Sequence, residues 1–137
     1  MFDLLKWQAR SRSVLAEISG RAEFLPMSSA QPWNAASLNA LESEMLQTWQ
    51  HPAEMPAANR ELYELFLGEG LCRLFGGKWQ VLGPELLGKD AETGCGLGVA
   101  YRDGSIDVVS SLVPLAFWAG TGTWWQTVFG TTRRLQS

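Results

Sequence analysis

Histidine and cysteine are scarce in this chain, which has one histidine and two cysteines among its 137 residues. A metal site built from histidines is therefore excluded, and a catalytic triad would have to use His51. His51 precedes Pro52, and the residue before a proline is disfavoured in helical geometry, so we expect it exposed at the end of a helix. Cys72 and Cys95 form no Cys-x-x-Cys pair, so the sequence predicts no metal site. It has no P-loop, and the glycine-rich segment 94–98 lacks the spacing of a dinucleotide-binding motif, so it predicts no cofactor.

Charged residues are also few, at 18% of the chain against 46% hydrophobic residues. Disordered chains show the opposite balance, so we expect most of the sequence to fold. The length predicts a single domain over residues 1–137. The net charge of −3 argues against a nucleic-acid partner, because the phosphate backbone is bound mainly by lysine and arginine.

Uninterrupted apolar segments, which secretion or membrane insertion would need, are missing. The N-terminus lacks the apolar core of a signal peptide, which predicts a cytoplasmic protein with two reduced thiols. Residues 108–132 carry no charge, but Pro114 and Gly120 interrupt them, so we expect no membrane span. The segment instead predicts a buried apolar helix over 112–119 and a further helical stretch to residue 134. The pattern leaves open whether these are one helix or two.

Three helices are predicted in the first part of the chain, over residues 3–19, 37–50 and 56–75. Apolar residues surround nearly the whole circumference of the third helix, which is typical of a buried central helix. In the second helix, Glu42 and Glu44 lie off the apolar stripe, so we expect both to be exposed.

Glycines punctuate the third predicted helix and the region that follows it. Gly68 and Gly70 are poor helix formers, and their presence indicates that another backbone passes close by. After the Gly-Gly pair at 76–77 the hydrophobic period changes from helical to extended. Strands are predicted over residues 78–82, 97–102 and 105–109.

Asp103 and Gly104 separate the last two predicted strands. An Asp-Gly pair between extended segments predicts a two-residue hairpin with a type I′ turn. The predicted fold class is therefore α+β: three N-terminal helices, a small antiparallel sheet with a hairpin over 97–109, and a C-terminal apolar helix packed on it.

Glu69 and Arg73 are four residues apart, so they share one face of the third helix. That face is otherwise apolar, and a charge buried alone would be costly, so we expect a structural ion pair. The alternative is a small enzyme or ligand-binding protein whose pocket lies between the sheet and the terminal helix. Glu69, Arg73 and Tyr101 would then line the pocket.

A spaced set of residues carries a resemblance to known proteins: Tyr63, Gly68, Glu69, Arg73, Gly76, Gly77 and Trp79. It is similar to small bacterial proteins of uncharacterised function, in which a helix carrying Gly-Glu ends at Gly-Gly and leads to a tryptophan-bearing strand and a hairpin. Some proteins of this type are encoded beside secreted toxins and neutralise them. The resemblance covers residues 60–110 and implies an immunity function, without any catalytic residue.

Negative charge is concentrated in residues 35–70, where Arg60 stands against six glutamates for a net charge of −5. Such a segment is usually a solvated face, and it can also attract a basic partner. The leading hypothesis is a non-enzymatic protein-binding module that neutralises a basic toxin, and a homodimer that buries the aromatic C-terminal end is a further possibility. Docking is expected through the segment 42–69, the loops 83–95 and 101–107, and exposed tryptophans as anchors. The polar contacts expected are Glu54, Glu61, Glu64, Asp103 and Asp107.

Overall fold

The computed structural model describes residues 2–83 and 96–137, and it confirms the α+β class. The N-terminal part is helical: α1 (Leu4–Arg12), α2 (Val14–Ile18), η1 (Ala22–Phe24), α3 (Ala35–Thr48), η2 (Pro52–Glu54) and α4 (Ala57–Phe75). The strands and the remaining helices follow: β1 (Lys78–Leu82), β2 (Gly96–Ala100), β3 (Ile106–Asp107), η4 (Val109–Ser111), α6 (Leu112–Ala119) and α7 (Trp124–Gln136). Of the predicted loop over 83–95, only residue 83 is among the described residues, and Cys95 lies outside them.

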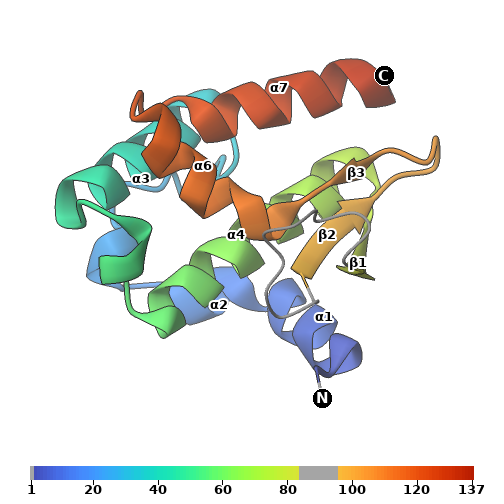
Figure 1. Cartoon of the computed structure of the whole chain (residues 1–137), viewed down its shortest axis with the longest axis horizontal. Coiled ribbons are helices and arrows are strands. Elements are labelled where there is room, and N and C mark those ends of the chain that lie inside the picture. The colour runs from blue at the N-terminus through green and yellow to red at the C-terminus, as the bar shows by residue number, and fades with distance from the viewer. Residues whose placement is uncertain (1, 84–95) are drawn as a thin grey trace.

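The first predicted helix is broken in two, because α1 ends at Arg12 and α2 begins at Val14. At the break the backbone N–H of Ser13 donates to the carbonyl of Arg10 at 3.1 Å, which closes a tighter turn than an α-helix makes. The change of direction lets both short helices pack against α4. Figure 1 shows α1 and α2 below α4 in this view.

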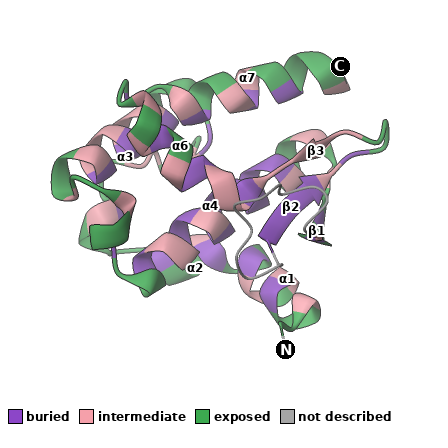
Figure 2. Cartoon of the chain, viewed as in Figure 1, coloured by how far each residue is buried: buried purple, intermediate pink, exposed green. Residues whose placement is uncertain are grey.

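Helix α4 is the central element, as its apolar circumference predicts. Every residue from Leu65 to Leu71 is buried, and Figure 2 shows the burial along α4. Helices α1, α2, α6 and α7 and strands β1 and β2 all pack against it. The hydrophobic core is therefore formed by elements that surround α4.

The explanation of the two glycines within α4 is corrected by the structure. Tryptophan rings, not a second backbone, occupy the space that side chains would fill. A Cβ atom at Gly68 would collide with the ring of Trp79, and one at Gly70 with the ring of Trp33. Gly68 and Gly70 are thus notches in the helix surface into which two indoles pack.

The sheet has the antiparallel order β1-β2-β3, with Trp79 opposite Val99 and Val99 opposite Asp107. The hairpin lies where it was predicted, but the turn type differs. The Gly104 N–H donates to the Tyr101 carbonyl at 3.1 Å and only Gly104 in this turn has a positive φ, of 91°. A type I′ turn needs two positive φ angles, so the loop is a three-residue turn that ends in a left-handed glycine.

The C-terminal region forms two helices, α6 and α7, which resolves the question that the sequence left open. Gly120, with a φ of 67°, ends α6. Among the described residues, no helix has both the length and the apolarity needed to cross a bilayer. Figure 1 shows α7 running along α3, and the two helices are in contact.

Candidate functional site

Glu69 and Arg73 form the expected ion pair on the C-terminal half of α4. Arg73 Nε donates to Glu69 Oε2 at 2.6 Å, and Glu69 is 5% exposed. The second carboxylate oxygen, Oε1, accepts from Ser11 Oγ at 2.7 Å, and that hydroxyl accepts from Trp79 Nε1 at 2.9 Å. Both oxygens of the buried carboxylate are satisfied, as a buried charge requires.

Arg73 is held at three places although its side chain is 42% exposed. Besides the bond to Glu69, its Nη2 donates to the backbone carbonyl of Arg12 at 3.0 Å. Its guanidinium also lies over the ring of Trp33, 5.4 Å from the ring centre. The guanidinium therefore has a fixed orientation.

A cavity of about 300 Å³ opens beside this pair, and it lies between α1, the end of α4 and the start of β1. Its lining comprises Gln8, Arg12, Glu69, Cys72, Arg73, Gly77, Lys78 and Trp79. The predicted pocket was placed between the sheet and the terminal helix, and the structure places this cavity elsewhere.

Tyr101, the third predicted pocket residue, is not among the residues that line this cavity. It lines a neighbouring hollow of about 520 Å³ on the β1–β2 side. Its hydroxyl donates to Asp107 Oδ2 at 2.7 Å, and burial together with the Asp107 carboxylate raises the tyrosine pKa above its ordinary value. Tyr101 thus belongs to a separate polar contact.

Cys72 is a free, half-buried thiol at the wall of the cavity. Burial and, secondarily, the nearby Glu69 carboxylate raise its pKa to about 12. A thiol with that pKa is protonated at neutral pH, so it is a poor nucleophile. Cys72 contributes packing to the cavity wall.

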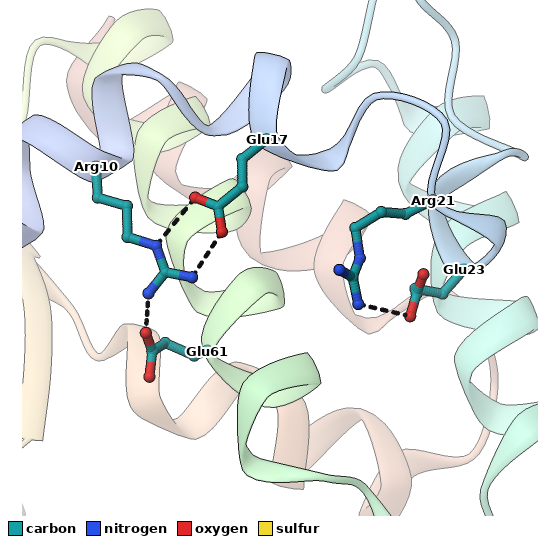
Figure 3. Close-up of polar contacts among 5 residues, drawn as sticks. All are labelled: Arg10, Glu17, Arg21, Glu23 and Glu61. Carbon is teal, nitrogen blue, oxygen red and sulfur yellow. Dashed lines mark hydrogen bonds and ion pairs between the residues drawn. The ribbon is translucent and has the colours of Figure 1, made fainter.

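Two of the predicted docking glutamates are engaged within the chain. Glu61 pairs with Arg10, which also donates to both oxygens of Glu17 (Figure 3). Glu64 lies 3.5 Å from Arg60 Nε, and its side chain is only 13% exposed. Arg10 lies outside the acidic segment 35–70 and neutralises part of the negative charge of that segment.

The other three predicted docking residues lie in two different places. Glu54 is exposed in η2, where its Oε1 accepts from the backbone N–H groups of Gln50 and His51. Asp103 is exposed at the hairpin and accepts from Ser105 Oγ at 2.6 Å. Asp107 is half-buried in β3, the second strand of the same hairpin. The five acidic residues therefore do not form one cluster.

One exposed tryptophan was not singled out from the sequence. Trp118 is 83% exposed on α6, and Leu115, one turn earlier, is 37% exposed. The sequence indicates only that tryptophans crowd this segment, yet Trp125 is fully buried. Trp125 belongs to a different helix, α7, whereas Trp118 lies on the side of α6 opposite the buried Val113 and Ala116.

His51 is exposed, as expected from its place before proline. Within residues 2–83 and 96–137, no group of three or more histidine, cysteine, aspartate or glutamate side chains could hold a metal ion. No family model matches the chain, and neither a curated protein nor a solved structure matches it. Its function is therefore argued from the geometry above.

Proposed function

We propose that this chain is a non-enzymatic protein-binding module that neutralises a partner toxin in the cytoplasm and anchors that partner with Trp118. The observation that carries the proposal is the 83% exposure of Trp118 on a helix whose opposite side is buried. Exposing a large indole to water is unfavourable, and tryptophan is among the residues that contribute most to protein interfaces.

The surroundings of α6 support a basic partner. Helix α6 packs against η2, the turn that carries the exposed Glu54. Residues 108–132 contribute no charge of their own, so an apolar anchor stands beside an acidic turn. An apolar pocket rimmed by lysine or arginine on the partner would complement this surface.

The experiment is affinity capture from the source organism, followed by measurement of the dissociation constant for the protein recovered in stoichiometric amount. Trp118→Ala is expected to weaken that complex by a factor of about 100, the usual effect of truncating a central interface tryptophan. Leu135→Ala is the matched control, because Leu135 is 61% exposed on α7. Expression of the recovered partner alone must also be toxic, and co-expression of this chain must abolish that toxicity.

The proposal fails if Trp118→Ala binds the partner as tightly as the wild type, or if the recovered protein is harmless when expressed alone. Recovery of this chain alone would indicate the homodimer instead. The alternative of a ligand-binding protein has the cavity beside Glu69 and Arg73 in its favour.

A further inference from the structure

The cavity beside α4 gathers three cationic side chains from three separate elements. Arg12 lies at the end of α1, Arg73 in the last turn of α4, and Lys78 at the start of β1. The one carboxylate in the lining is Glu69, which leaves the lining with a net charge of +2 in a chain whose total is −3.

Arg12 and Lys78 differ from several arginines elsewhere in the molecule, which pair with carboxylates within the chain. Arg10 and Arg21 each donate to a glutamate, as Figure 3 shows. Within the described part of the chain, Arg12 and Lys78 pair with no carboxylate, and Glu69 has both oxygens occupied. Among the described residues, the charges of Arg12 and Lys78 at the cavity are therefore not neutralised by a carboxylate.

The Arg73 guanidinium is already oriented before any ligand arrives. Glu69, the Arg12 carbonyl and the Trp33 ring fix it, as described above. A ligand that meets a fixed arginine does not have to bear the entropy cost of ordering that side chain.

The ends of α1 and α4 offer a competing explanation for two of the cations. Arg12 and Arg73 lie in the last turns of these helices, where the helix dipole favours positive charge. That explanation does not cover Lys78, which begins a strand and lines the same cavity.

We propose that this cavity binds the phosphate group of a small phosphomonoester. A phosphate dianion balances the net charge of +2, and lysine and arginine are the side chains that hold phosphate in proteins. Arg12 and Lys78 contact the phosphate oxygens beside the fixed Arg73, and the rest of the molecule lies against Trp79 and Gly77. A volume of about 300 Å³ suits a small metabolite.

The test is a titration of the whole chain with inorganic phosphate at pH 7.5, at constant ionic strength maintained with chloride, followed by ¹H–¹⁵N NMR. Saturable shifts are expected at the backbone amides of Arg12, Arg73 and Lys78, which carry the cationic side chains of the cavity. Lys78→Gln and Arg12→Gln are each expected to raise the dissociation constant about tenfold, the effect of losing one charged hydrogen bond. Both side chains lie on exposed residues, so the variants are expected to fold.

Arg134→Gln is the matched control, since it removes the same charge from an exposed residue of α7 that does not line the cavity. The proposal is overturned if the shifts do not saturate, or if Lys78→Gln binds phosphate as Arg134→Gln does. Equal binding of acetate would overturn the assignment to a dianion. None of these readouts involves Trp118 or a protein partner, so the proposed function and this site can fail independently.

Discussion

The carboxylate of Glu42, on α3, accepts the backbone N–H groups of Trp125 at 2.8 Å and Trp124 at 3.0 Å. It thereby caps the N-terminus of α7 from a different helix, more than eighty residues away along the chain. Thr123, at the N-cap position itself, makes no side-chain cap. Burial raises the pKa of Glu42, and the two N–H groups oppose that rise by favouring the charged form.

Glu42→Ala is expected to destabilise the protein by about 2–4 kcal/mol, because it leaves two N–H groups at a helix start unsatisfied and opens a cavity. Glu42→Gln keeps one acceptor and should cost less. Urea unfolding of both variants measures these changes. If Glu42→Ala lost less stability than Glu42→Gln, the carboxylate would not be the cap.

The expectation that Glu42 is exposed was wrong for a reason that a single sequence hides. Helical periodicity places Glu42 beside the apolar stripe of α3, and a glutamate there is ordinarily solvated. In the folded protein it is buried where the N-terminus of α7 packs on α3. The partner of the carboxylate is a pair of backbone N–H groups, and these carry no sequence signal.

Local signals predicted most of the helices and strands, although they missed the break at Ser13 and the turn type at the hairpin. The strand Lys78–Leu82 and the central helix ending at Phe75 were predictable, because a Gly-Gly pair separates two clear periodicities. The Glu69–Arg73 pair was predictable from helical spacing. Its cavity was not, since Arg12 and Lys78 reach it only after α1 packs against α4 and β1.

At Gly68 and Gly70, the two notches in α4, we expect substitution by alanine to change the stability differently than at most helix positions. Alanine stabilises most helices relative to glycine, but at Gly68 its Cβ would collide with the Trp79 ring. Gly68→Ala is therefore expected to cost about 1–3 kcal/mol through overpacking. The thermal unfolding midpoint, with near-ultraviolet circular dichroism of the tryptophans, measures the effect.

Gly130→Ala in α7 is the matched control, because nothing lies within 4 Å of a Cβ added there. It is expected to stabilise the protein by up to about 1 kcal/mol. Equal effects of the two substitutions, in sign and size, would show that the Trp79 ring moves aside without cost.

The raised pKa of the Glu64 carboxyl group leads us to expect that the free energy of unfolding falls as the pH rises. Burial raises its pKa to about 7 from an ordinary value of 4.5, against the opposing effect of Arg60. The folded state therefore holds a proton that the unfolded state has released, so this group's contribution is full below pH 4.5 and is lost as the pH passes 7. Glu64→Gln should flatten the stability profile over this interval, measured by urea unfolding at successive pH values.

Glu17 provides a control of opposite sign, because its hydrogen bond with Arg10 lowers its pKa. Its contribution is present above the ordinary pKa of 4.5 and is lost as the pH falls through the lower folded value. Glu17→Gln should leave the fall between pH 4.5 and pH 7 intact. If it removed that fall while Glu64→Gln did not, the assignment to Glu64 would be wrong.

Asp107 joins the hairpin to the last helix, so a substitution there tests whether the residue is structural or a docking contact. Its Oδ2 accepts from Tyr101 Oη at 2.7 Å and from Thr132 Oγ1 at 2.6 Å. Asp107→Ala leaves both hydroxyls without this partner and is expected to cost about 1–3 kcal/mol. Faster amide hydrogen exchange in the second half of α7 would show that its contact with the sheet has loosened.

Arg102→Ala is the control at the same hairpin, since Arg102 is exposed and the cost there should be within about 0.5 kcal/mol. A docking role for Asp107 predicts a different outcome. Asp107→Ala would then weaken the partner complex while exchange in α7 stayed unchanged. Asp107 Oδ2 already accepts two hydrogen bonds within the chain, one of them from Thr132, which is only 3% exposed, so we expect the structural outcome.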